Sequence, residues 1–91
     1  MSNEIVLKVK IWDTSDVVFE GEADRVSSFN EMGSFDVLKM HANFISIIRH
    51  KLTLYRHGKI VKEFDIGQAV IKVKHDIVHI FLGIEAFAID E

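Results

Sequence analysis

Five histidines are the residues of this chain that could bind a transition metal: His41, His50, His57, His75 and His79. Zinc sites usually add cysteine to histidine, or set two histidines in an H-E-x-x-H helix. The chain has no cysteine and no such motif. On a strand, His75 and His79 would lie roughly 13 Å apart, although a tight turn at Asp76 would change that geometry. We therefore expect ordinary histidines at turns and strand ends, and no metal site.

Carboxylates are the second group that could do chemistry, and five of them surround one turn and one strand: Asp13, Asp16, Glu20, Glu22 and Asp24. Two adjacent carboxyl groups can act as general acid and base. Here they alternate with apolar residues such as Phe19 and Ala23, which is typical of the solvated side of a strand. The glycines form no phosphate-binding motif, and no serine has a nucleophile-elbow context. The sequence therefore predicts no catalytic residue and no cofactor.

Composition narrows the class of protein further. Ninety-one residues make one small domain, and 48% hydrophobic residues suffice for a packed core. The net charge is −3 with both signs interspersed, so we expect no nucleic-acid partner. No apolar run approaches the ~18 residues that a membrane span needs, and the N-terminus does not read as a signal peptide. A cytoplasmic protein without direct membrane insertion is expected.

Short apolar runs recur about every ten residues and alternate with polar positions, which is the pattern of half-buried strands. The runs cover residues 5–11, 17–29, 35–38, 44–48, 51–55, 60–66, 69–74 and 77–82. Gly21 interrupts the long second run and predicts a bulge that lets one strand serve two sheets. This spacing predicts an all-β fold, a small β-sandwich of about eight to ten mostly antiparallel strands over residues 1–83, followed by a short tail, 84–91.

The late strands carry apolar residues on both faces. Val70, Ile71 and Val73 cannot all point to one side, whereas a sandwich strand usually keeps one face polar. A fully covered central strand would explain this pattern, and so would a surface that meets a partner. We hypothesise an apolar contact surface built from Val70, Phe81, Ile84 and Phe87.

Three segments, taken in order, resemble a known family. They are Phe19-x-Gly21, Gly33-Ser34-Phe35-Asp36-Val37 and Met40-His41-Ala42. The chain resembles, over nearly its whole length, the N-terminal β-sandwich domain of the epsilon subunit of F-type ATP synthases, with its F-x-G, G-x-x-G-I and G-H-A segments. It departs where the family has P-G-H-A-P and this chain has Lys39-Met40-His41-Ala42-Asn43. Most members also continue into a C-terminal helical hairpin, which the sequence up to Glu91 lacks.

The resemblance implies a non-catalytic central-stalk subunit of a rotary proton-translocating ATP synthase. Such a subunit binds the gamma subunit and the c-ring, couples rotation to ATP synthesis, and lies peripheral to the inner face of the energy-transducing membrane. By position, the partner contacts would be Glu31, Met32, Ser34, Lys39, Met40, His41 and Asn43. Two alternatives remain: a stand-alone β-sandwich interaction module that self-associates as a homodimer, and a small ligand- or metal-binding protein that uses the histidines.

Overall fold

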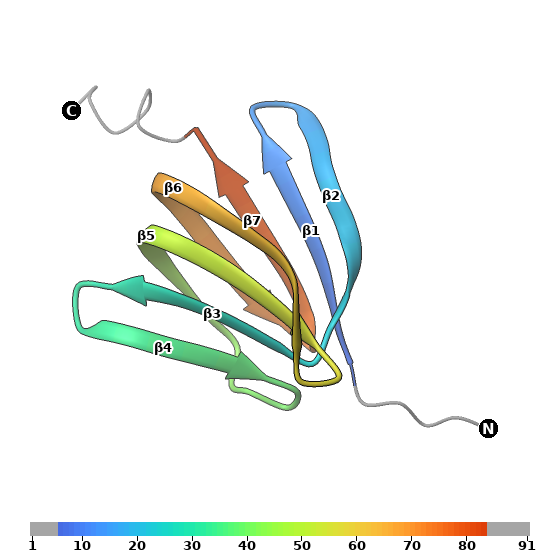
Figure 1. Cartoon of the computed structure of the whole chain (residues 1–91). Coiled ribbons are helices and arrows are strands. Elements are labelled where there is room, and N and C mark those ends of the chain that lie inside the picture. Colours follow the sequence, from blue (N-terminus) through green and yellow to red (C-terminus); the bar gives the residue numbers. More distant parts are fainter. Residues whose placement is uncertain (1–5, 84–91) are drawn as a thin grey trace.

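The computed structural model describes residues 6–83, which form seven strands and no helix. The strands are β1 (Leu7–Asp13), β2 (Asp16–Ala23), β3 (Arg25–Asn30), β4 (Gly33–Leu38), β5 (Phe44–Arg56), β6 (Lys59–Lys74) and β7 (Ile77–Leu82). Their order in the sheet is β2-β1-β7-β6-β5-β3-β4 (Figure 1), and only the β1–β7 pair is parallel. The predicted all-β class is confirmed. The predicted tail, residues 84–91, lies outside the described residues.

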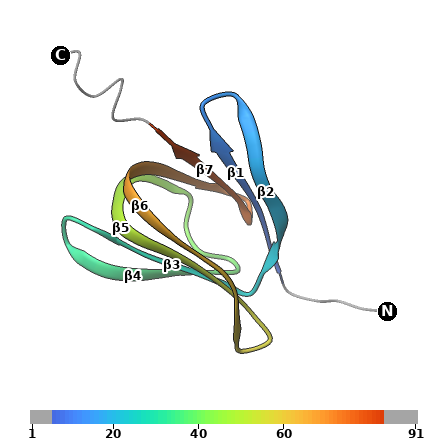
Figure 2. The ribbon, with the colours of Figure 1, turned by 45° about the horizontal axis from the view of Figure 1, so that its top comes forward.

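The β5–β6 hairpin joins the two halves of the curved sheet, which are β2, β1 and β7 on one side and β3 and β4 on the other. Its 13- and 16-residue strands pair along their whole length, while β3 pairs with the later part of β5 and β7 with the later part of β6. The register shifts where Arg49 faces Gln68 and His50 faces Ile66, so that Gly67 is an extra residue. Such a bulge bends a strand without ending it. Figure 2 shows the resulting curvature.

This continuity explains why the described residues form seven strands and not the expected eight to ten. The runs 44–48 and 51–55 are both parts of β5, and the runs 60–66 and 69–74 are both parts of β6. A sequence reading takes the polar residues between the runs as turns. The backbone instead passes through them as a bulge and keeps its hydrogen bonds.

The long second run does serve both halves of the sheet, but not through a bulge at Gly21. It divides at Asp24, so that β2 pairs with β1 and β3 pairs with β4 and β5. The β1–β2 register is regular at Gly21 and shifts between Ile11 and Trp12. Gly21 instead leaves room for an aromatic ring, because a Cβ there would lie 3.1 Å from the Phe19 ring.

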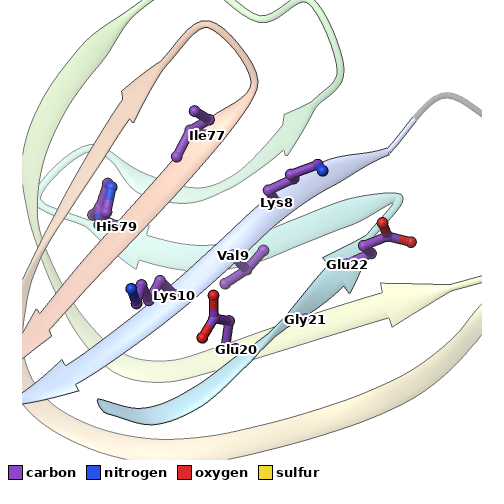
Figure 3. A pocket seen from close by; sticks show the side chains of 8 residues that line it. All are labelled: Lys8, Val9, Lys10, Glu20, Gly21, Glu22, Ile77 and His79. Atoms are coloured by element: carbon purple, nitrogen blue, oxygen red, sulfur yellow. The ribbon is translucent and has the colours of Figure 1, made fainter. Parts of the chain in front are cut away.

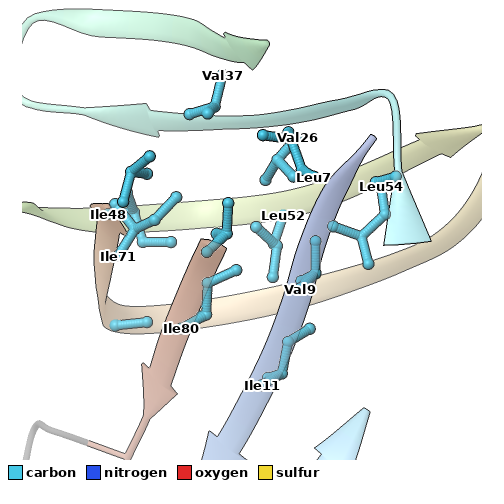
Figure 4. Close-up of a cluster of buried hydrophobic side chains, with 14 residues drawn as sticks. Leu7, Val9, Ile11, Val26, Val37, Ile48, Leu52, Leu54, Ile71 and Ile80 are labelled. Atoms are coloured by element: carbon cyan, nitrogen blue, oxygen red, sulfur yellow. The ribbon is translucent and has the colours of Figure 1, made fainter. Parts of the chain in front are cut away.

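The core lies between the two halves of the curved sheet (Figure 4), and its 14 apolar side chains are at most 2% exposed. These residues are Leu7, Val9, Ile11, Ala23, Val26, Val37, Ile48, Leu52, Leu54, Ala69, Ile71, Val73, Val78 and Ile80. Full burial of one such Val, Leu or Ile side chain contributes about 1.5–3 kcal/mol. Because these buried residues alternate along their strands, the residues between them face outward, and the candidate site lies on this outer face.

Candidate partner-binding surface

A row of apolar side chains crosses the outer face of five neighbouring strands, and we call it the apolar band. In sheet order its members are Ile47, Val70, Phe81, Trp12 and Val17, each opposite the next in the strand register. Ile47 is 49% and Val17 42% exposed, and the three between them are half-buried. Four strand spacings make a row about 19 Å long. Contiguous exposed apolar surface is common at protein–protein contact sites, which makes this partly exposed row a candidate contact surface.

Ring contacts hold the centre of the apolar band in place. The Trp12 and Phe81 rings stack with centroids 6.5 Å apart, and the His79 ring stacks on Phe81 at 6.0 Å. Trp12 Nε1–H donates a hydrogen bond to His79 Nδ1 over 3.4 Å. Lys10 Nζ lies 5.0 Å from the Trp12 ring centroid, within reach of a cation–π interaction. The central aromatic residues are therefore preorganised for contact.

The structure brings together two of the four residues from which the sequence predicted an apolar contact surface. Val70 and Phe81 lie opposite each other on β6 and β7. Ile84 and Phe87 lie outside the described residues. Sequence reasoning missed Trp12, Ile47 and Val17. A signal was present at Trp12, because it is a large aromatic residue at an outward position of β1 where Lys8 and Lys10 are charged.

The next predicted contact residues lie at the β3–β4 turn, with Glu31 and Met32 in the turn and Ser34 at the start of β4, and all three are exposed. Met32 is 87% exposed, and its backbone N–H donates to Asn30 Oδ1 over 2.8 Å. A shallow hollow in this region is lined by Glu31 and Met32 from the turn and by Ile47 from β5. The turn therefore borders the Ile47 end of the apolar band.

Lys39, Met40, His41 and Asn43 lie in the connection between β4 and β5. Asp76, in the β6–β7 turn, holds this loop: its Oδ1 accepts from the Met40 backbone N–H over 2.6 Å, and its Oδ2 lies 3.9 Å from Lys39 Nζ. Asn43 Oδ1 accepts from a backbone N–H of the same turn over 2.9 Å. The loop is thus fastened without proline.

His41 and Met40 have different structural roles in that loop. The His41 ring packs on Phe44 with centroids 5.0 Å apart, and its Nδ1 lies 2.9 Å from the Ala42 carbonyl oxygen. Met40 has φ +67° and is 83% exposed. It stands at the glycine position of the resembled G-H-A segment, and it keeps the left-handed backbone that glycine adopts most easily.

The two loop groups do not form one site. The β3–β4 turn precedes Gly33 and the other loop follows Leu38, and these residues are the two ends of β4. Five residue steps along a strand separate them by about 17 Å. The predicted contact residues therefore fall into two separate groups, and the first of them adjoins the apolar band.

Two of the acidic residues around β2, Glu22 and Asp24, form hydrogen bonds and ion pairs that stabilise the fold. Arg56 Nη1 donates to Asp24 Oδ1 over 3.1 Å, and Nη2 donates to Glu22 Oε1 over 3.4 Å. The hydrogen bond from the His57 backbone N–H, together with Arg56, holds the pKa of Asp24 below its usual value. These contacts tie the β5–β6 turn to the point where the chain changes sheet halves. Within residues 6–83, no three His, Cys, Asp or Glu side chains lie together as a metal site would need.

A sequence model of the family described as ATP synthase, delta/epsilon chain, beta-sandwich domain matches residues 6–83. The chain belongs to this family. The match confirms the predicted resemblance and covers every described strand of the delta/epsilon sandwich. No helix within these residues is long and apolar enough to cross a membrane.

Solved structures of ATP synthases share the fold of this delta/epsilon domain. A chain in the Euglena gracilis mitochondrial ATP synthase, a structure of OSCP, F1 and the c-ring, matches with TM-score 0.77 and 13% identity over 90% of this chain. A chain in the Tetrahymena thermophila mitochondrial ATP synthase, a structure of the central stalk and c-ring, matches with TM-score 0.68 and 9% identity over 90%. The matches span 53% and 66% of those two chains. A search of curated proteins found no match.

Proposed function

We propose that this chain is a non-catalytic central-stalk subunit of a rotary proton-translocating ATP synthase. In this role it binds the gamma subunit and the c-ring and couples rotation to ATP synthesis at the inner face of the energy-transducing membrane. The observation that carries the proposal is the delta/epsilon family match over residues 6–83. Two neighbours of the same fold come from ATP synthase structures that include the c-ring, which adds support.

The apolar band is the part of the surface best suited to the gamma subunit. Phe81 and Trp12 lie at its centre, and exposed aliphatic residues lie at both ends. Central aromatic anchors surrounded by apolar contacts typically supply most of the binding energy of an interface. Burying the band against gamma would remove this apolar surface from water.

Coupling also requires that the subunit transmit force without deforming. β5 and β6 run unbroken through both halves of the sheet, and one close-packed core fills the space between the halves. Such interiors have low compressibility. Two partners need two contact areas, and the two loop groups at opposite ends of β4 fit that need. The Met32 turn lies beside the apolar band, and the Met40–His41 loop lies about 17 Å away from that turn.

Co-purification tests this proposal. A tagged copy of the chain, expressed in its own cells, should retain the gamma subunit and c-subunits when membranes are solubilised in a mild detergent. Recovery of the tagged chain as a homodimer without either subunit would instead support the interaction-module alternative, and bound zinc would support the third alternative. Either outcome, obtained while other ATP synthase subunits stay assembled in the same extract, would contradict the stalk role.

A further inference from the structure

Four lysines lie on the same outer face as the apolar band, along one side of it. We call Lys8 and Lys10 of β1 and Lys72 and Lys74 of β6 the lysine grid. In the strand register Lys72 lies opposite His79, which lies opposite Lys10, and Lys74 and Lys8 are related in the same way through Ile77. Figure 3 shows the β1 lysines beside His79 and Ile77 of β7. The grid spacing is about 7 Å along the strands and about 10 Å across them.

This positive charge is only partly compensated within the chain. None of the ion pairs that the structure shows among residues 6–83 uses a grid lysine. Glu20 and Glu22 of β2 lie opposite Lys10 and Lys8, but Arg56 already binds Glu22. On the β6 side neither register neighbour of Lys72 is a carboxylate, because these neighbours are Ile45 and His79. The four lysines and the two glutamates of these rows leave a net charge of 4 − 2 = +2, whereas the chain as a whole has a net charge of −3.

We propose that the apolar band and the lysine grid together bind one amphipathic helix of a partner protein, whose apolar stripe is flanked on one side by Asp and Glu. This inference rests on the proposed function, since it describes the chemistry of the partner at that surface. A helix that lies along the apolar band runs across the strands and presents side chains about 10.5 Å apart at i and i+7. This is close to the spacing of about 10 Å between the β1 and β6 lysines.

A second copy of the chain fits this face poorly. Two copies related by a twofold axis that runs across the apolar band would bring their lysine grids near each other. Like charges brought together across an interface cost several kcal/mol. The charge pattern therefore disfavours that homodimer, and the size of the chain in solution, with and without the Glu-flanked peptide, tests for any other homodimer through this face.

Binding of designed peptides to the full 91-residue chain tests this inference without any ATP synthase subunit. Two helical peptides share one leucine stripe, and one carries Glu along its flank where the other carries Lys. Trp12 is the only tryptophan and lies in the apolar band, so its fluorescence reports binding to this surface. The Glu-flanked peptide should bind at least about tenfold more tightly at low salt, and the difference should shrink toward 1 M salt, where the Debye length is about 3 Å.

A matched pair of variants isolates the grid. Lys72→Glu/Lys74→Glu should weaken binding of the Glu-flanked peptide by at least about tenfold and leave the melting temperature close to that of the parent chain. Lys59→Glu/Lys62→Glu changes the net charge equally on the same strand, at exposed positions where β6 does not pair with β7, and should leave binding unchanged.

Three results would overturn the inference: equal binding of both peptides, equal effects of the two double variants, or binding to anionic phosphatidylserine vesicles without binding to the Glu-flanked peptide.

Failure of this inference is distinguishable from failure of the proposed function. Gamma binding that is insensitive to the grid substitutions, with no peptide binding, would remove only the helix proposal. Peptide binding as expected, with no binding of gamma, would remove only the stalk role.

Discussion

Replacement of Phe81 by aspartate should abolish partner binding while the domain stays folded. Phe81 is half-buried and stacks on Trp12, an interaction of about 0.5–1.5 kcal/mol. Losing that stack and part of the buried apolar area should lower the free energy of unfolding by about 1–3 kcal/mol. A chain of 91 residues has a free energy of unfolding of about 5–14 kcal/mol, so the variant should remain folded.

Phe81→Asp should reduce partner binding by a larger fraction than it reduces the stability of the fold. Truncation of a central aromatic anchor typically costs at least about 2 kcal/mol of binding free energy, which is about 30-fold in Kd. The buried carboxylate adds a desolvation cost. Titration calorimetry with the gamma subunit measures Kd, and thermal denaturation followed by circular dichroism measures the fold.

Two further variants make the test specific to the apolar band. Ile60→Asp places the same charge at another exposed apolar residue, 54% exposed, on the part of β6 that does not pair with β7. It should change neither Kd nor stability by more than about 0.5 kcal/mol. Phe81→Leu keeps most of the apolar volume and should give an intermediate Kd. Folded Phe81→Asp that binds within threefold of the parent chain, or Ile60→Asp that binds equally poorly, would refute the reasoning.

Three other predictions concern the fold. Gly21→Ala should change the free energy of unfolding by less than about 1 kcal/mol, because the end of the Phe19 ring, 3.1 Å from the new Cβ, moves by a few tenths of an ångström while Ala removes the entropic cost of Gly in a strand; chemical denaturation measures this, and a larger loss would show that the ring cannot move. Met40→Gly should stabilise by about 0.5–1 kcal/mol, since φ is +67° there; a lower melting temperature would contradict the strain argument. Asp24 has a lowered pKa, so its contribution to the free energy of unfolding is present above the unfolded value near 3.8 and is lost as pH falls through the folded pKa. In Asp24→Asn the free energy of unfolding should therefore fall less steeply with decreasing pH in the acid range. An unchanged acid dependence would show that other carboxyl groups cause it.

Alternation was enough to predict where most strands lie. In β1 the alternating apolar residues Leu7, Val9 and Ile11 are the buried ones, whereas the apolar run of β7 did not indicate which of its faces is buried. Period-two burial is a local property, because successive side chains on a strand point to opposite faces. The hairpin turn at residues 56–59 was also readable from Gly58, which has φ +77°.

The number of strands, and whether two apolar runs belong to one strand, could not be predicted from alternation. Whether Arg49 and His50 form a turn or a bulge depends on the partner strand, where Gly67 supplies the extra residue. Gly21 looked like a bulge, yet its role depends on a ring two residues away that packs over it. These outcomes depend on packing between segments, which a single run of residues does not contain.

The sequence by itself determined the family, the all-β class and the presence of unexplained apolar residues in the late strands, because these depend on local patterns and their order. Only the tertiary structure decided that Val70 and Phe81 join Ile47, Trp12 and Val17 in one row, since that row depends on the register of five strands. It also separated the two loop groups to opposite ends of β4 and brought lysines from β1 and β6 onto one face. Strand register places residues that are distant in sequence within one side-chain length of each other, and for that reason the composite surface is visible only in the folded chain.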